Sequence, residues 1–282
     1  MKCNIWMLLG LFSFITGCSS IMDSDTAPKP RRWAAYYNYE KQGEDFADYE
    51  LIVTDASYFP PLEPIQALGT QVYGYVSIGE VRGDDPVYQF AKEKNLIIGH
   101  NADWDSHIID IREPWWHKYI LEFVMPALEK DGFDGVMFDT ITSPFNAAQG
   151  DDTMLEMHKA AVALIRSARE RFPNLKIMVN RGFAILPEMA PYIDATLAES
   201  ILAVPDETYP GQFRLLRRSY YDSIVAMLHQ IQKKNPHLTI YSLDYWQMDD
   251  KSGTQELYKT QRDQGFIPYI STPDLRTLHI EE

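Results

Sequence analysis

Short apolar segments alternate with longer amphipathic ones from Trp33 onward, and this alternation limits the possible fold more than any other feature of the sequence. Several of the short segments are almost continuously apolar, which is typical of parallel strands buried on both faces. The pattern therefore predicts a parallel sheet with helices between its strands. The predicted strands are residues 33–37, 51–55, 72–78, 135–139, 176–180, 195–199, 239–244 and 267–271.

Apolar residues at helical spacing, bounded by proline or glycine, predict helices over residues 114–130, 154–172 and 213–234. Eight strand–helix units favour an α/β fold with a closed (β/α)8 TIM barrel in a single domain over an open, doubly wound sheet. No Gly-rich dinucleotide fingerprint follows the first strand, which argues against the doubly wound alternative. Residues 108–111 could add one short strand, and nothing in the pattern predicts an antiparallel hairpin.

The N-terminal residues carry the pattern of an export signal. Lys2 supplies a small positive charge, and residues 5–15 form an apolar run that is too short to span a bilayer stably. The run ends in Ile15-Thr16-Gly17-Cys18, which resembles the lipobox at which bacteria cleave a signal peptide and acylate the cysteine. An ordinary signal peptide or a buried N-terminal helix is the alternative.

The lipobox sets the predicted domain organisation. Residues 1–17 are predicted to be a lipoprotein signal peptide, residues 18–32 a lipidated tether that is polar and contains proline, and residues 33–282 the barrel. The only other cysteine, Cys3, lies in the signal peptide, so the mature chain has no pair for a disulfide. We therefore expect a protein of the bacterial cell envelope, lipid-anchored to the outer membrane, the periplasmic face or the cell surface.

Charge and composition exclude several classes of function. The formal net charge of −14 makes nucleic acid an improbable partner, because phosphate binding requires a basic face. The seven histidines are scattered and show no metal-ligand spacing, so we expect neither a metal site nor a cofactor. The sequence also lacks the GxSxG elbow of the common esterases.

Carboxylates gather at the ends of the predicted strands. The active site of a (β/α)8 barrel lies at the C-terminal ends of its strands. Any single acidic residue there could merely cap the next helix, but hydrolysis of a glycosidic bond needs two carboxylates. Five acidic residues end or closely follow these strands, and they are Asp55, Glu80, Asp139, Glu199 and Asp244.

Asp139 has the clearest sequence context of the five. It ends an apolar strand that begins after Asp134-Gly135, a pair expected to turn the chain at the bottom of the barrel. Alternation along residues 195–199 could point Glu199 either into the barrel or toward the next helix. Trp246 could stack on a sugar ring, whereas Trp115-Trp116 is interpreted as core packing.

The ordered set of motifs resembles the endo-α-1,4-polygalactosaminidase family of glycoside hydrolases, family 114, and its bacterial relatives, including the hydrolase domain of the Pel exopolysaccharide deacetylase-hydrolase. The resemblance covers nearly the whole predicted barrel, although each motif alone is short. The matching segments are residues 49–53, 72–80, 132–140, 180–183, 198–200, 243–245 and 265–269.

The resemblance implies an endo-acting enzyme that cleaves α-1,4-linked galactosamine or N-acetylgalactosamine polysaccharide. It places the catalytic residues after the fourth and sixth strands, at Asp139 and Glu199, and suggests a retaining reaction with Asp139 as nucleophile and Glu199 as acid/base. An acidic cleft would attract a cationic polysaccharide. The residues expected to bind the substrate are Tyr37, Asp55, Tyr75, Glu80, Asn180, Arg181, Asp244, Tyr245 and Trp246.

Two alternatives stay open at the level of sequence. The chain could hydrolyse a different α-linked glycan, or it could be a lipoprotein that binds polysaccharide without cleaving it. The presence of both Asp139 and Glu199 argues against the second alternative, because a binding protein has no need of a catalytic pair.

The lipobox yields a direct test. We expect Cys18→Ser to leave the protein uncleaved or soluble, because serine offers no thiol for acylation. Membrane fractionation and incorporation of a labelled fatty acid measure the effect, and Cys3→Ser serves as the matched control that keeps the label. Membrane retention of Cys18→Ser with an undiminished acyl label would contradict the lipoprotein assignment.

Overall fold

A computed structural model describes residues 30–281 of the chain. The predicted signal peptide, Cys18 and residues 19–29 of the predicted tether lie outside these described residues. Within residues 30–281, none of the helices combines the length and the apolar character that a membrane span requires.

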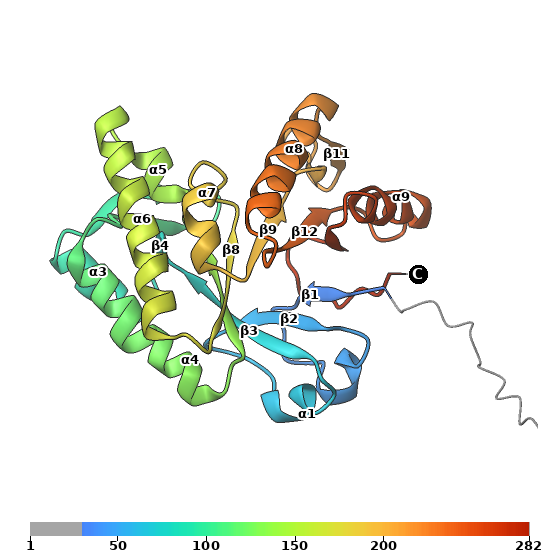
Figure 1. The fold of residues 1–282 in the computed structure, drawn as a ribbon, viewed down its shortest axis with the longest axis horizontal. Coiled ribbons are helices and arrows are strands. Elements are labelled where there is room, and N and C mark those ends of the chain that lie inside the picture. Colours follow the sequence, from blue (N-terminus) through green and yellow to red (C-terminus); the bar gives the residue numbers. More distant parts are fainter. Residues whose placement is uncertain (1–29, 282) are drawn as a thin grey trace, which may run out of the picture. The chain divides into compact units, whose positions relative to one another are not determined.

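Eight strands form one parallel sheet that curves into a nearly closed barrel (Figure 1). Their spatial order follows the chain, and every hydrogen-bonded neighbour is parallel, so the predicted TIM-barrel class is confirmed. The strands are β1 (Trp33–Ala35), β2 (Leu51–Asp55), β3 (Gln71–Ser77), β7 (Gly135–Asp139), β8 (Lys176–Asn180), β9 (Ala195–Glu199), β12 (Thr239–Tyr245) and β13 (Ile267–Ser271).

Aromatic side chains pack across the seam between β1 and β13. The Trp33 ring lies edge-on to Tyr241 and Tyr269, with ring centroids 5.4 and 5.8 Å away. Beyond the end of β1, the backbone N–H of Tyr37 donates to the carbonyl oxygen of Leu275 over 2.8 Å. Within residues 30–281, β1 and β13 form no ladder of hydrogen bonds with each other. Buried aromatic rings therefore close the barrel between these two strands.

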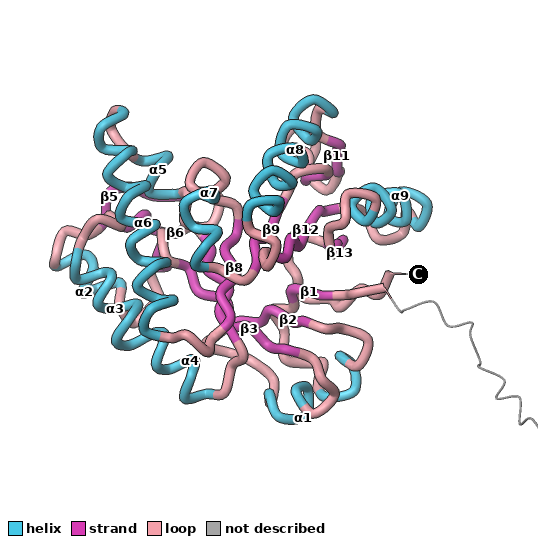
Figure 2. The backbone as a smooth tube through the Cα atoms, viewed as in Figure 1, coloured by secondary structure: helices cyan, strands magenta, loops and turns pink. Residues whose placement is uncertain are grey.

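Helices of very different length cover the outside of the barrel (Figure 2). The predicted helix 114–130 is α3, a π-helical turn and α4 in succession, and the predicted helix 154–172 begins slightly earlier, as α6. The helices are α1 (Leu62–Gln66), α2 (Tyr88–Glu93), α3 (Pro114–Tyr119), α4 (Met125–Asp131), α5 (Ser143–Ala147), α6 (Asp151–Arg171), α7 (Leu186–Met189), α8 (Arg218–Lys234) and α9 (Lys251–Arg262), with short turns η1 (Gly43–Phe46), η2 (Ile120–Val124) and η3 (Ala190–Tyr192).

The long helix α6 illustrates how the sequence sets these elements. Asp151 and Asp152 in its first turn and Arg169 and Arg171 in its last turn complement the helix dipole. Its buried side chains recur every three or four residues and so form one apolar face toward the barrel. They are Met157, Ala161, Leu164, Ile165 and Ala168.

Two antiparallel insertions interrupt the β/α alternation. The sequence analysis did not predict them, because it found no hairpin pattern. β4 (Glu80–Arg82), β6 (Ser106–Ile109) and β5 (Ile97–Asn101) form a three-stranded sheet in the order β4-β6-β5 between β3 and β7. The possible extra strand at 108–111 overlaps β6 and belongs to this small sheet. β10 (Ala203–Pro205) and β11 (Phe213–Leu215) form a hairpin between β9 and β12.

The second insertion corrects one predicted helix. Residues 213–215 lie in β11, and α8 begins only at Arg218. The apolar residues Phe213, Leu215 and Leu216 continue the helical pattern in sequence, but residues 213–215 pair with β10 instead. Pairing with a neighbouring strand therefore overrides the local periodicity at the start of this segment.

The turn after β3 depends on a glycine that the sequence analysis did not single out. A Cβ atom on Gly79 would overlap the carbonyl oxygen of Thr140 and would lie 2.8 Å from Cδ of Pro144. The backbone N–H of Gly79 also donates to the Thr140 hydroxyl over 2.9 Å. This close approach holds the ends of β3 and β7 against each other.

We expect Gly79→Ala to lower the free energy of unfolding by about 1–3 kcal/mol, because the added methyl group must displace backbone rather than a flexible side chain. Urea denaturation measures the change. Gly83→Ala is the matched control, since a Cβ atom there meets nothing within 4 Å. Equal stability of the two variants would show that the contact at Gly79 is dispensable.

Candidate active site

Three polar residues end three neighbouring strands at the same edge of the barrel. Asp139 ends β7, Asn180 ends β8 and Glu199 ends β9. The Nδ2 atom of Asn180 donates to Oδ1 of Asp139 over 2.8 Å and to Oε2 of Glu199 over 2.5 Å. Because one nitrogen donates both bonds, the two accepting oxygens lie no farther apart than the sum of these distances. The structure thus brings the two expected catalytic carboxylates together.

Three tyrosines surround this pair. The Tyr245 hydroxyl donates to Oε1 of Glu199 over 2.5 Å, and the Tyr75 hydroxyl forms a hydrogen bond with Asp139. The Tyr37 ring packs edge-on against Tyr75 with centroids 5.4 Å apart. Burial, and then the nearby carboxylates, raise the pKa of all three phenols well above the ordinary value. The phenols therefore stay protonated, and those of Tyr75 and Tyr245 act as donors toward the carboxylates.

The pKa of Asp139 is shifted upward. Burial, followed by repulsion from the Glu199 carboxylate, raises this pKa to about 6. Hydrogen bonds from the Thr140 backbone and from the side chains of Asn180 and Tyr75 oppose the shift, because they favour the ionised form. Asp139 therefore keeps its proton up to a higher pH than an exposed aspartate does.

The backbone turns sharply after each of these three residues. Thr140, Arg181 and Ser200 have φ values of 61°, 56° and 54°, in the left-handed region that non-glycine residues seldom adopt. Each such residue costs on the order of 1–3 kcal/mol and persists where the surroundings hold it. Thr140 is held by Gly79 and by the Ser77 hydroxyl at 2.8 Å, and Arg181 by its Nη1 bond to the Glu199 carbonyl oxygen over 2.9 Å. These turns aim the preceding side chains into the mouth of the barrel.

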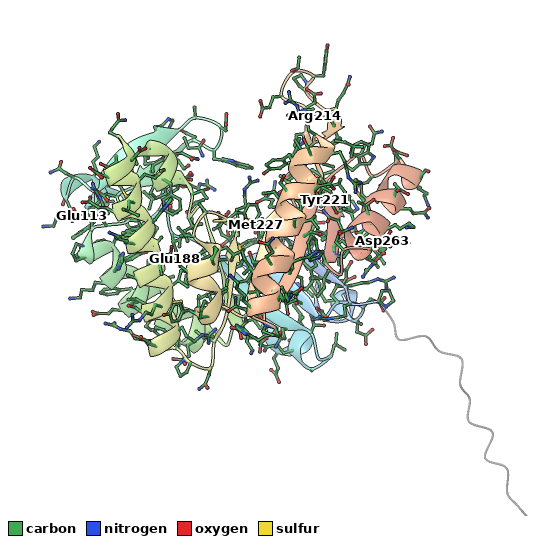
Figure 3. All side chains as sticks on the ribbon, turned by 45° about the horizontal axis from the view of Figure 1, so that its top comes forward. Glu113, Glu188, Arg214, Tyr221, Met227 and Asp263 are labelled. Carbon is green, nitrogen blue, oxygen red and sulfur yellow. The ribbon has the colours of Figure 1, made fainter. Side chains whose placement is uncertain are left out.

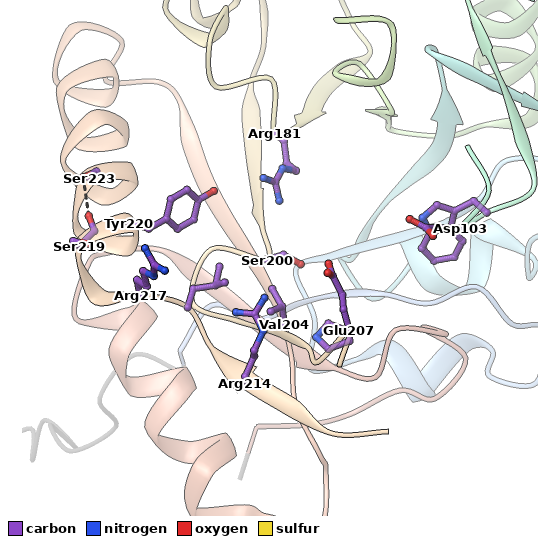
Figure 4. Close-up of a pocket in the computed structure, with 13 residues that line it drawn as sticks. Asp103, Arg181, Ser200, Val204, Glu207, Arg214, Arg217, Ser219, Tyr220 and Ser223 are labelled. Carbon is purple, nitrogen blue, oxygen red and sulfur yellow. Dashed lines mark hydrogen bonds between the residues drawn. The ribbon is translucent and has the colours of Figure 1, made fainter. Parts of the chain in front are cut away.

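A cavity of about 1100 Å³ is lined in part by the residues that directly follow Asn180 and Glu199, whereas Asp139, Asn180 and Glu199 do not line it themselves (Figure 4). Arg181 and Ser200, the residues that directly follow Asn180 and Glu199, form the part of its wall next to the pair. The β10–β11 hairpin, the first turns of α8 and the turn that carries Trp104 supply the other walls. This volume slightly exceeds the roughly 300–1,000 Å³ of small-molecule sites, so the cavity has room for an oligosaccharide.

Asp244 does not line the cavity, contrary to expectation. Its side chain is 0% exposed and accepts hydrogen bonds from the backbone N–H groups of Leu202 and Ala203, over 2.8 and 2.9 Å, and from Nε2 of Gln261 over 2.5 Å. Side chains alternate along a strand, and Tyr245 is the one that faces Glu199. Asp244 therefore faces the outer side of β12 and fastens the β9–β10 loop to α9.

Glu80 likewise serves the fold and not the cleft. It is buried in the small antiparallel sheet, where Nδ2 of Asn101 donates to Oε1 over 3.1 Å and the Ser106 hydroxyl donates to Oε2. Both carboxylate oxygens are therefore engaged between strands. Glu80 was expected to bind the substrate, but its position in the insertion makes it a link between β4, β5 and β6.

Two further expected binding residues make local contacts. The Asp55 carboxylate accepts bonds from the backbone N–H and the hydroxyl of Ser57, over 2.7 and 2.6 Å, and so shapes the turn after β2. The Trp246 indole N–H donates to Asp250 over 2.9 Å, and its ring packs near Phe213 with centroids 6.2 Å apart. Asp55 is also close enough to Tyr37 to influence its pKa, whereas Trp246 joins β12 to α9 and to β11.

The sequence analysis missed the basic residues of the cavity. Arg214 and Arg217 line it from β11 and from the start of α8, and Tyr220 lies beside them. Arg214 lies near the N-terminal end of α8 (Figure 3). Placing residues 213–234 in one helix concealed this arrangement. The available signal was the local cluster of arginines at 214, 217 and 218 in an otherwise acidic chain.

The side chains present limit the capacity of the site to bind a metal ion. Among residues 30–281, no group of three or more His, Cys, Asp or Glu side chains is arranged so that it could hold a metal ion.

Comparisons with known proteins place this geometry in context. The model of glycoside hydrolase family GH114 matches residues 20–281, which confirms the resemblance seen in the sequence. The glycoside hydrolase domain of PelA from Pseudomonas aeruginosa has a TM-score of 0.78 and 25% identity, over 89% of this chain and 98% of that one. Aspergillus fumigatus Ega3, solved in complex with galactosamine, has a TM-score of 0.63 and 15% identity, over 88% and 93% of the two chains. No match was found among curated proteins.

The Asn180 bridge predicts a measurable titration. We expect Asn180→Ala to raise the pKa of Asp139 by about one unit, because a hydrogen bond to a charged group is worth roughly 1.5–3 kcal/mol and favours the ionised form. Carboxyl ¹³C NMR of labelled protein follows the titration of Asp139 directly. Asn101→Ala, which removes an amide bonded to Glu80 outside the cleft, is the control. An unchanged or lowered pKa of Asp139 in Asn180→Ala would contradict the role given to the bridge.

Proposed function

The chain belongs to glycoside hydrolase family GH114, and from this premise we propose that it cleaves α-1,4-linked galactosamine or N-acetylgalactosamine polysaccharide at internal bonds. The observation that carries the proposal is the pair Asp139 and Glu199, joined by the amide of Asn180 at the ends of adjacent strands. Two carboxylates in one cleft are the groups that glycoside hydrolysis requires.

The choice of sugar is supported by the family and by the site. Ega3, which shares the fold, was solved with galactosamine bound. In this chain, Asp139 and Glu199 supply negative charge that attracts a cationic amino sugar, and Tyr37 and Tyr75 supply flat rings beside them. The adjoining cavity gives room for further sugar units, as internal cleavage of a polymer requires.

We propose a retaining mechanism with Asp139 as nucleophile and Glu199 as acid/base. The two bridging bonds, of 2.8 and 2.5 Å, hold one oxygen of each carboxylate close to the other, which supports the short carboxyl separation of retaining pairs, roughly 5–5.5 Å, over the roughly 6.5–9.5 Å that leaves room for a water. Burial and Glu199 raise the pKa of Asp139, and three hydrogen bonds limit this rise, which helps Asp139 to reach the ionised form that a nucleophile requires.

The two steps then follow from this geometry. An Asp139 oxygen attacks the anomeric carbon, the bond to the leaving oxygen breaks, and Glu199 gives its proton to that oxygen. In the second step Glu199 takes a proton from a water molecule, whose oxygen attacks the anomeric carbon and releases Asp139. Tyr245, bonded to Glu199, orients the carboxyl group in both steps.

We also propose that Cys18 anchors the enzyme at the cell envelope through its lipid. The support for this location is the lipobox-like Ile15-Thr16-Gly17-Cys18 and the polar segment that follows it. A tethered hydrolase would act on polysaccharide at or near the cell surface.

Incubation with partially deacetylated α-1,4-galactosaminan, followed by mass spectrometry of the products, tests the proposed function. We expect a ladder of oligosaccharides from the wild type and none from Asp139→Ala. The exposed carboxylate Asp152, on α6 and outside the cleft, provides the control variant Asp152→Asn with full activity. Intact polymer after incubation with the folded wild type would contradict the proposed substrate.

Substrates with different leaving groups distinguish the roles of the two carboxylates. Glu199→Ala should lose about 10²–10⁴-fold on the polysaccharide but much less on an aryl glycoside, whose leaving group needs little protonation. Azide should restore turnover of that variant and give an α-configured glycosyl azide. NMR of the first product of the wild type reads the stereochemistry, and a β-configured product would establish inversion and exclude Asp139 as nucleophile.

A further inference from the structure

The large cavity lies on one side of the carboxylate pair only. Its walls come from the ends of β8 and β9, from the β10–β11 hairpin, from the first turns of α8 and from the turn between β5 and β6 (Figure 4). Among the described residues that line it, none belongs to β1, β2 or β7 or to the loops that follow these strands. The lining residue Arg181 is bonded to the carbonyl oxygen of Glu199 over 2.9 Å. The cavity is therefore on the Glu199 side of the pair.

The surroundings of Asp139 lie toward the other half of the barrel. The Tyr75 hydroxyl, from β3, bonds to Asp139, and Tyr37, just past β1, packs against Tyr75. In the strand order β1-β2-β3-β7-β8-β9-β12-β13, β1 and β2 are four places away from β8 and β9. The loops after β1 and β2 thus lie across the barrel mouth from the cavity.

Exposed aromatic rings flank the carboxylate pair on both sides. In the loops after β1 and β2, Tyr39 and Tyr58 are 36% and 62% exposed, and their ring centroids lie 5.1 Å apart. In the cavity, Trp104 and Tyr220 are 70% and 38% exposed, and Figure 4 shows Tyr220 pointing from α8 toward Arg181. Rings of this kind offer flat apolar area to the faces of sugar units.

The chemistry of glycoside hydrolysis gives the two sides different roles. The nucleophile attacks the anomeric carbon on the face opposite to the leaving oxygen, and the acid must reach that oxygen to protonate it. With Asp139 as nucleophile and Glu199 as acid, the leaving oxygen is on the Glu199 side. The sugar unit that carries this oxygen extends farther from Asp139, in the direction of the cavity.

We propose that the cavity binds the sugar units on the reducing-end side of the cleaved bond, and that Tyr39 and Tyr58 contact units on the non-reducing-end side. The proposal rests on the proposed function, because it uses the roles given to Asp139 and Glu199. Trp104 and Tyr220 then hold the part of the polysaccharide that leaves in the first step. The part that stays attached to Asp139 extends over the loops after β1 and β2.

Cleavage positions in a defined oligosaccharide test the proposal. The probe is an α-1,4-linked galactosamine hexasaccharide with a fluorescent label at its reducing end, and chromatography of the labelled products identifies the cleaved bond. Loss of contacts on one side lets fewer sugar units bind there. Trp104→Ala/Tyr220→Ala should therefore shorten the labelled products, and Tyr39→Ala/Tyr58→Ala should lengthen them. We expect each variant to change the ratio of labelled disaccharide to labelled tetrasaccharide at least ~3-fold, in opposite directions.

The exposed ring of Phe123, on η2 at the outside of the barrel, provides the control variant Phe123→Ala, which should keep the wild-type pattern. Trp104→Ala and Tyr58→Ala, at the more exposed ring of each side, should give smaller shifts in the same directions and serve if a double variant does not fold. Reversed shifts, or the wild-type pattern in all variants, would overturn the proposal and leave the cleavage of galactosaminan intact.

Binding without turnover separates this proposal from the proposed function. In the Asp139→Asn protein, a nitroxide at the reducing end of the hexasaccharide should broaden the indole N–H signal of Trp104 but not that of Trp115, on α3. A nitroxide at the non-reducing end should leave the Trp104 signal sharp, and broadening of Trp104 from that end alone would overturn the proposal. The expected broadening together with an uncleaved hexasaccharide in the wild type would contradict only the proposed cleavage. Absence of binding would overturn both.

Discussion

The bridge from Asn180 to Asp139 and Glu199 is the interaction on which the site depends. Two carboxylates this close repel each other, and burial makes the repulsion stronger because little solvent screens it. The amide nitrogen of Asn180 donates one hydrogen to each carboxylate. These two bonds offset part of the repulsion and fix the position of one carboxylate relative to the other. The phenols of Tyr75 and Tyr245, which burial keeps in their protonated form, complete the set of donors to the pair.

Polar contacts elsewhere in the barrel hold the strand ends that carry Asp139, Asn180 and Glu199. Three successive strands end in a left-handed turn, and the turn after β7 is pressed against Gly79. Asp244 and Glu80, which are acidic residues close to the same edge, are buried and joined to neighbouring segments. Much of the acidic character near the site is therefore structural, and only Asp139 and Glu199 are brought together at its centre.

Specific features of the cleft come from the insertions and not from the repeated β/α units. The small sheet after β3 contributes the turn with Trp104, and the hairpin after β9 contributes Arg214. These segments surround a cavity whose lining includes three arginines, although the whole protein is acidic. The net charge of the protein therefore governs only the long-range attraction of a charged substrate. Which sugar substituent binds at each part of the cleft depends on the charged groups within a Debye length, about 8–10 Å.

The sequence alone determined the barrel, because eight apolar segments buried on both faces can be satisfied by few other arrangements. It also predicted that Asp139 and Glu199 end strands at the same edge of the barrel, since parallel strands bring their C-terminal ends to one edge. Only the tertiary structure decided which way Asp244 and Tyr245 point, because that depends on the register of β12 against β9. It likewise decided that residues 213–215 pair as a strand and that Asn180 joins the pair. Those outcomes depend on contacts between segments far apart in the chain, and local periodicity contains no information about such distances.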